Sequence, residues 1–529
     1  MSKEKVFEML DDYIIRLKKA KKKEKRSDGQ PLVFKPFYSC IRLWRNKYYA
    51  LDIENGGTQL RSSSNGYSYM SQIEIRMGDY KRGGSMACAN CRLPKGLEKD
   101  AGLVKFLGEA NKVFWDCLYE HEVRNQKSFG KHRRRDDFVY FSEEESIIYD
   151  EEDSDFTVSV EEIEDTLKRV TRDLKRPDIY TVEADFLATN VANFLVNTEG
   201  SRIFSVRKVC YIVLKAKTVD NRNLLIPNVD VFYGLDTADL PGYDYLMVKG
   251  EKVVRDLLDI VKSPIQKSGG YPVILDSVNH GYLHHEIVGH YVEGHRQQGD
   301  DFGDIASLFM GRVGERVAPE FLSIYDDPTI PGLNGSYKHD EDGVKAQKVL
   351  LIENGILKNF LHSRESAGFF KTKSNGHARS DGLKEPVSRM SNLVVKSSNQ
   401  VSREELIERM QKDCKDKKIP YGLIFENSIG GATYATESVF GTYPINIFRI
   451  TPRGKKTRVR GIHVVGTPQE VAMKIVQTSN NYQTNPGGCG AESGKIYVSE
   501  TAPDAYVRSL AINRVKSSEY DEVKNPVLK

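Results

Sequence analysis

The sequence lacks several features that would place it in common classes of protein. None of its apolar runs is long enough to cross a bilayer. Its first residues include Lys3, Glu4, Lys5 and Glu8, where a secretion signal would have an apolar segment. These absences predict a cytoplasmic protein that has no place in a membrane.

Charge and short motifs exclude further classes. Lys and Arg number 78 against 74 Asp and Glu, so the formal net charge is only +4. This balance gives no general attraction to nucleic acid, and the basic run at 18–26 is more often a solvated helix end. No G-x-S-x-G motif is found, which argues against a serine hydrolase. The segment 490–495 fails as a phosphate loop because Ile496 replaces the required Ser or Thr.

Cysteine is scarce, and its pattern is irregular. Seven cysteines form an odd set, which predicts free thiols in a reducing compartment instead of a disulfide framework. Cys88 and Cys91 form a C-x-x-C without a second such pair. We therefore expect a turn with two ordinary thiols there, not a structural zinc site.

The stretch His285–His290, HEIVGH, is the most informative motif that is present. A catalytic zinc ion needs about three protein ligands and one open position, and an adjacent carboxylate can accept a proton from water. The common zinc-protease motif spaces its histidines four apart, whereas here they are five apart. On a regular helix the two rings would point roughly 140° apart. We therefore expect an extra residue in the helix, a π-bulge near Gly289.

The surroundings of the motif leave two interpretations open. Residues 273–275 predict a buried strand, and Asp276 or Ser277 a helix N-cap. Several further histidines lie nearby, so the motif alone fits solvated surface histidines equally well. Cys489 could complete the site as a thiolate, although its glycine-rich segment, 485–494, is by itself more typical of a flexible loop.

The decapeptide at 285–294, HEIVGHYVEG, together with the distant Cys489, resembles the TldD/PmbA family of metallopeptidases. The resemblance extends from about Lys35 to about Val515 and favours the metal-bearing, TldD-like type, because the motif is retained. Other segments resemble family sequence in family order, namely 73–80, 197–200, 326–329, 340–343, 351–357, 388–392 and 459–461.

The resemblance implies a site and partners. Zn²⁺ would be held by His285, His290 and Cys489, with Glu286 as general base. It also implies peptide or unfolded-protein substrates and an enclosed site in a dimer. That dimer would be a homodimer, or a heterodimer with a motif-lacking PmbA-like subunit.

Other residues near these positions have less certain assignments. Arg389 and Asn392 are expected either to bind substrate in a peptide groove or to have structural roles. Three further residues could support the ligands or replace one of them; these are Glu293, His284 and His295.

The length and the mixed periodicity predict an α+β protein of two or three domains. We expect an N-terminal α+β domain at 1–124, a charged linker and central α+β domain at 125–240, and a larger, mostly β metallopeptidase domain at 241–529. Helices are expected at 6–17, 103–118, 159–174 and 253–261, and strands within 39–80 and at 443–450 and 458–465.

We therefore expect a cytoplasmic zinc-dependent peptidase. Two rival interpretations remain. One is a non-catalytic regulatory or scaffold subunit of a peptidase complex. The other is a metal-dependent amidase that acts on a non-peptide substrate.

Overall fold

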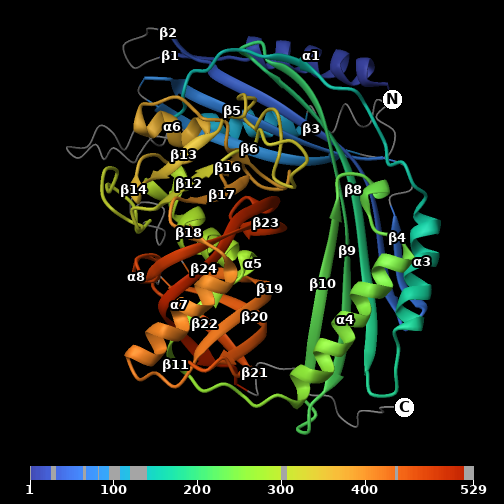
Figure 1. Ribbon diagram of the computed structural model, residues 1–529. Helices are drawn as coiled ribbons and strands as arrows, with labels where there is room; N and C mark the ends of the chain where they lie inside the picture. The colour runs from blue at the N-terminus through green and yellow to red at the C-terminus, as the bar shows by residue number, and fades with distance from the viewer. Residues whose placement is uncertain are drawn as a thin grey trace.

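The computed structural model describes residues 2–25, 31–63, 67–81, 83–93, 108–119, 140–298, 307–434 and 439–516. Within these ranges, helices mix with strands that form two large sheets. One sheet crosses the top and right of Figure 1, and the other fills its lower left. The predicted α+β class is therefore confirmed. None of the helices in these ranges is both long and apolar enough to cross a membrane.

The first sheet is antiparallel along the order β10-β9-β8-β3-β5-β6. The strands predicted within 39–80 are confirmed by β3, β4 and β5. Cys88 lies within β6, so the turn expected there is wrong. The bounds are β3 Pro36–Glu54, β4 Gly57–Ser63, β5 Ser68–Asp79, β6 Gly83–Leu93, β7 Ile148–Asp150, β8 Thr181–Asn197, β9 Arg202–Val219 and β10 Leu225–Gly234.

Helices cover the outer face of this sheet (Figure 1). α1 (Lys3–Lys19) buries the apolar face expected from its periodicity, and α3 (Val160–Asp173) begins at the predicted cap Ser159, whose hydroxyl accepts from the Glu162 amide. α4 (Tyr243–Lys262) packs on β9 and β10. The described part of the second predicted helix, 108–118, is helical, whereas 103–107 and the first half of the charged linker, up to residue 139, lie outside the described residues. A separate hairpin pairs β1 (Lys22–Lys25) with β2 (Pro31–Phe34).

Strands from both 1–124 and 125–240 pair in this one sheet. The domain boundaries stay a prediction.

The second sheet is mixed and follows the order β11-β19-β20-β22-β24-β17-β12-β13-β14. β23 pairs with β24 in a long hairpin that brings the C-terminal region against the centre of the chain. The strand predicted at 458–465 is instead two strands, β21 and β22, separated where Gly461 takes a φ of 74°. β15 Ala378–Arg379 and β16 Val387–Ser388 pair in a separate two-stranded sheet. The strands of the second sheet are β11 Gly269–Leu275, β12 Leu322–Asp326, β13 Val349–Glu353, β14 Ile356–Leu357, β17 Asn392–Ser397, β18 Gln400–Val401, β19 Gly422–Tyr434, β20 Val439–Ile450, β21 Lys456–Val459, β22 Ile462–Gly466, β23 Ile475–Ala491 and β24 Gly494–Arg514. Its helices are α5 Ser277–His284, α6 Arg364–Phe370, α7 Arg403–Asp416 and α8 Pro468–Ala472.

The second sheet and its helices form the second lobe of the protein, and the motif helix is packed inside it. β11 ends at Leu275, and the Asp276 carboxylate accepts from the Asn279 amide to cap α5, so Asp276 is the correct one of the two predicted caps. α5 contacts β24, β19 and β23, so the residues that follow it are held against the hairpin. The structure thereby places the HEIVGH motif beside residues that lie about 200 positions further along the chain.

Candidate metal centre

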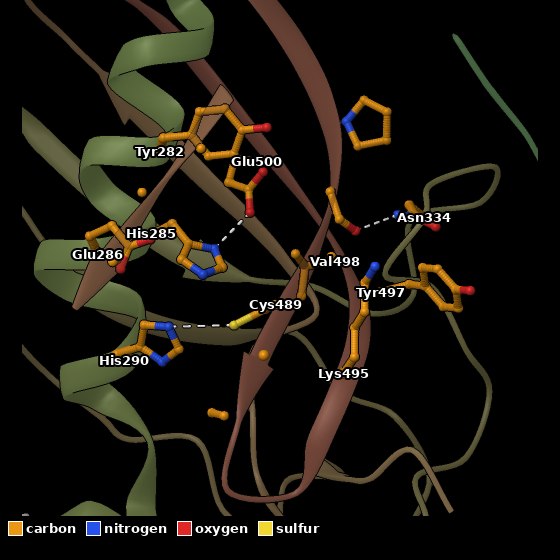
Figure 2. A pocket seen from close by; sticks show the side chains of 18 of the residues that line it. Tyr282, His285, Glu286, His290, Asn334, Cys489, Lys495, Tyr497, Val498 and Glu500 are labelled. Carbon is orange, nitrogen blue, oxygen red and sulfur yellow. Dashed lines mark hydrogen bonds and ion pairs between the residues drawn. The ribbon is translucent and has the colours of Figure 1, made fainter. Parts of the chain in front are cut away.

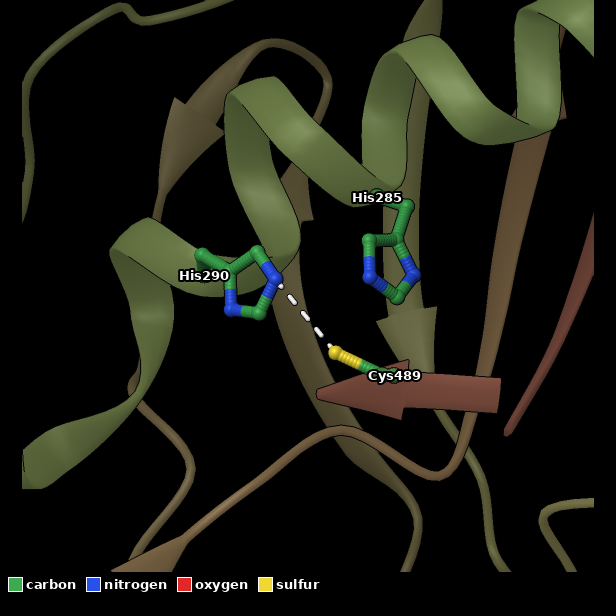
Figure 3. Close-up of side chains that lie close together, drawn as sticks. All are labelled: His285, His290 and Cys489. Carbon is green, nitrogen blue, oxygen red and sulfur yellow. Dashed lines mark hydrogen bonds between the residues drawn. The ribbon is translucent and has the colours of Figure 1, made fainter. Parts of the chain in front are cut away.

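The motif occupies a helix with an extra residue in one turn. α5 is followed by a π-helical turn, His285–Gly289, and then by a 3₁₀ turn, His290–Val292. The expected π-bulge is confirmed. Because of it, the imidazole rings of His285 and His290 come to one side, with centroids 5.0 Å apart (Figure 3).

Gly289 is required for a reason that the spacing did not reveal. Its φ is −51°, an ordinary helical value that any residue can adopt. A Cβ atom at this position would lie 1.9 Å from the Met390 Sδ atom. The glycine therefore lets the bulged helix approach the buried Met390, whereas the bulge itself does not need its backbone freedom.

Cys489 supplies a third donor atom to the same place. It lies on β23 and pairs with Ile496 of β24, so its glycine-rich segment is a hairpin strand and the loop interpretation is wrong. The Sγ atom is 3.4 Å from the His290 Nε2 atom, and one donor atom from each of His285, His290 and Cys489 lies within 4.8 Å of the others. Donors around one tetrahedral zinc ion lie roughly 3.3–3.7 Å apart, so these three side chains can meet one ion with small adjustments.

All three groups are buried, with exposed fractions of 6% for His285, 7% for His290 and 4% for Cys489. Burial alone would raise the pKa of the Cys489 thiol, but the two imidazoles lower that pKa well below its usual value. Burial would lower the pKa of His290, yet Cys489 and Glu293 raise it to about 9. The cluster therefore favours a thiolate, which is the form that binds a metal.

A carboxylate lies behind each imidazole. The His285 Nδ1 atom is 2.7 Å from Glu500 Oε1, and the His290 Nδ1 atom is 3.2 Å from Glu293 Oε2. Such a partner fixes the orientation of a ligand histidine and leaves its Nε2 atom for the metal. The sequence analysis missed Glu500, because no local motif connects it with His285, 215 positions earlier.

Glu286 lines the same cavity as the three donors (Figure 2). Its side chain is 4% exposed and accepts a hydrogen bond at Oε2 from the Thr433 hydroxyl. That hydroxyl also lies 3.0 Å from the Glu286 main-chain oxygen. A Cβ atom at Gly431 would lie 2.7 Å from Glu286 Oε1, so β19 packs closely against the carboxylate. Thr433 is a further residue that the sequence analysis missed.

The donors and Glu286 face a cavity of about 810 Å³ between the two lobes. The first sheet lines it with apolar and aromatic side chains from β9 and β10, namely Tyr211, Val213, Val231 and Tyr233. Charged side chains line the end near the hairpin, namely Arg296, Glu492 and Lys495. The cavity is large enough for several residues of an extended peptide.

The other predicted site residues lie around this centre. Among the residues with described positions, the group able to hold a metal is His285, His290 and Cys489, without His284 or His295. The His284 Nδ1 atom is 3.2 Å from the main-chain oxygen of His280, and His295 lies 3.6 Å from Glu492.

Arg389 and Asn392 are almost fully buried and do not line the cavity. The Arg389 side chain contacts Cys489, and the Asn392 amide donates to the Asp327 main-chain oxygen. A role for either residue in binding substrate stays a prediction.

A buried His/His/Cys cluster beside a carboxylate, open to a cavity, defines a candidate metal-dependent hydrolase site. The profile of the PmbA/TldA metallopeptidase C-terminal domain matches residues 268–514, which include the whole cluster. A metalloprotease of Methanocaldococcus jannaschii is 31% identical over 354 residues, 66% of this chain and 72% of that protein. The zinc metalloprotease TldD homolog of Saccharolobus solfataricus is 28% identical over 261 residues, 48% of this chain and 54% of that protein.

The solved structure of TldE from Thermococcus kodakarensis has the same fold, with a TM-score of 0.65 over 96% of this chain and 100% of that chain, at 15% identity. The chain belongs to the PmbA/TldD family.

Proposed function

We propose that this protein is a zinc-dependent peptidase that cleaves peptides or unfolded polypeptide segments. The observation that carries the proposal is the buried cluster of His285, His290 and Cys489, which lines the same cavity as Glu286. The names of the relatives, metalloprotease and zinc metalloprotease, support the same activity.

The residues present fit a zinc ion. Two imidazoles and a thiolate are preferred donors for zinc, and these three protein ligands would leave a fourth position for water. Zinc bound there would lower the pKa of a water molecule and polarise the scissile carbonyl group. Glu286 accepts the proton of the attacking water and then delivers it to the departing amine. The Thr433 hydroxyl holds the Glu286 carboxylate in place for both transfers.

The cavity also supports a mode of peptide binding. β10 is at one end of the first sheet as described, and Val231 and Tyr233 point from it into the cavity. An extended peptide can add to such an edge through main-chain hydrogen bonds, which suits substrates of varied sequence. We further propose that the working form is cytoplasmic and dimeric, as a homodimer or with a PmbA-like subunit that lacks the motif.

Metal content and cleavage, measured together, test this proposal. We expect the wild type to bind about one zinc per chain and to cleave unfolded peptides, whereas Glu286→Gln keeps the zinc and loses cleavage. Cys489→Ala should lose most of the zinc. If the wild type binds zinc but cleaves neither peptides nor small amides, the chain is a non-catalytic subunit. Cleavage of amides alone would favour the amidase interpretation.

A further inference from the structure

Cys489 has a second set of contacts, made by residues that do not line the cavity. The Arg389 side chain, between β16 and β17, is fully buried. Its Nη2 atom donates to the Cys489 main-chain oxygen at 3.0 Å and lies 3.1 Å from the Cys489 Sγ atom. Its Nη1 atom donates to the Ser493 hydroxyl at 2.9 Å. One guanidinium therefore holds both the sulfur and the hairpin that carries it.

The same arginine reaches the other half of the cluster through Glu293. The Arg389 Nε atom forms an ion pair with Glu293 Oε1 at 3.2 Å, and both side chains are completely buried. The second carboxylate oxygen, Oε2, lies 3.2 Å from the His290 Nδ1 atom and accepts from Arg296 Nε at 2.8 Å. A continuous path of contacts thus runs from Cys489 through Arg389 and Glu293 to His290.

Burying two charged groups is costly in free energy unless each finds well-placed partners. The buried pair of Arg389 and Glu293 therefore indicates a specific role. An arginine stays charged at every physiological pH, and its planar fork can hold several acceptors in fixed directions. A charged donor on a thiolate forms a stronger and more directional hydrogen bond than a neutral donor does. A carboxylate on the Nδ1 atom keeps the proton there and directs Nε2 toward the sulfur.

We propose that Arg389 and Glu293 are positioning residues of the metal site, which hold Cys489 and His290 in one preformed arrangement. The inference rests on the proposed zinc site and adds what keeps its two halves together. The motif helix and the hairpin are far apart in sequence, and the buried pair fixes one against the other. Arg389 therefore acts through Cys489 and Glu293, and it does not line the cavity.

The experiment measures metal binding, not cleavage, with Zn²⁺ and Co²⁺ as probes. Arg389→Met removes the charge and the fork, Arg389→Lys keeps only the charge, and Glu293→Gln removes the ion pair. We expect each to raise the dissociation constant for Zn²⁺ by about 10-fold to 100-fold in chelator competition. The absorption band of the thiolate bound to Co²⁺ should also shift in both Arg389 variants, because the hydrogen bond to sulfur changes.

A control variant separates this effect from a general loss of stability. Arg460 is also buried and forms an ion pair with Asp220 at 2.9 Å. Arg460→Met should leave the metal affinity and the band unchanged. In a Cys489→Ala background, Arg389→Met should have a smaller effect on the remaining affinity than in the wild type, because the contact with the sulfur is gone and only the contact through Glu293 to His290 is left.

Three outcomes would overturn the inference. Wild-type affinity in Arg389→Met is one, and an equal effect of that change with or without Cys489 is another. If Arg389→Met does not fold, Arg389→Lys takes its place, and wild-type affinity together with an unshifted Co²⁺–thiolate band in that variant is the third. A wild type that shows no thiolate band with Co²⁺ refutes the proposed zinc site itself, so the two failures can be told apart.

Discussion

Gly289→Ala tests why the motif carries a glycine before its second histidine. The added Cβ would lie 1.9 Å from Met390 Sδ, 2.9 Å from Cε and 3.2 Å from Cγ. An ordinary contact between such atoms is about 3.5 Å, so the Met390 side chain must retreat by about 1.6 Å. Met390 is 1% exposed and belongs to the main core of the second lobe, where little space is free.

The magnitude follows from two opposing effects. Overpacking a filled core costs about 1–3 kcal/mol, whereas alanine in place of a helical glycine gains up to about 1 kcal/mol. The backbone at Gly289, with φ −51° and ψ −54°, already suits alanine. We therefore expect Gly289→Ala to destabilise the wild type and to stabilise a Met390→Ala variant.

This change of sign can be measured by chemical denaturation of four proteins, namely the wild type, Gly289→Ala, Met390→Ala and the double variant. A chelator is added so that metal binding does not contribute to the midpoints. A long chain of this kind need not unfold in two states, so midpoints are compared between pairs and not converted to absolute stabilities. An equal destabilisation in both backgrounds, or a stabilisation of the wild type, would refute the role assigned to Met390.

Two further predictions concern the surroundings of the site, and a third concerns His339. Thr433→Val should lower kcat by about 10-fold to 100-fold, because a hydrogen bond to a charged group such as Glu286 contributes about 1.5–3 kcal/mol. Thr433→Ser keeps the hydroxyl and should restore kcat. An unchanged kcat in the valine variant contradicts this role. Glu500→Ala should weaken Zn²⁺ binding by about 10-fold to 100-fold, since His285 loses its orienting partner. Competition with a chelator measures the affinity. Wild-type affinity in this variant would show that Glu500 does not support the site. Burial and two nearby lysines lower the pKa of His339 from 6.5 to about 4. The unfolded chain therefore binds more protons between these values, and stability falls as the pH drops from 6.5 to 4. The wild type should lose stability relative to His339→Gln across that window and not above it, as followed by denaturation midpoints; a pH-independent difference would show that His339 does not titrate in this way.

The sequence alone predicted those elements whose causes are local. The helix from Ser159 and the strand before the motif depend on neighbouring residues and were predicted correctly, and the cap was narrowed to Asp276 or Ser277. The π-turn is also a local matter, since two ligands five residues apart on a regular helix diverge by roughly 140°.

The contacts that complete the site were decided by tertiary structure. Cys489 was only one open candidate until the family resemblance favoured it, and its segment is typical of a loop until β24 pairs with it. Thr433, Glu500 and Arg389 reach their partners across 147, 215 and 100 positions, where no periodicity or spacing connects them.

The physical reason is the range of the forces involved. Helix geometry and capping are set within a few residues by backbone sterics and hydrogen bonds. The meeting of the motif helix with the hairpin depends instead on strand order and register in a sheet assembled from distant segments. The sequence therefore determined the two imidazoles, the carboxylate and the bulge that aligns them. The tertiary structure decided which thiol, which hydroxyl and which buried charges surround them.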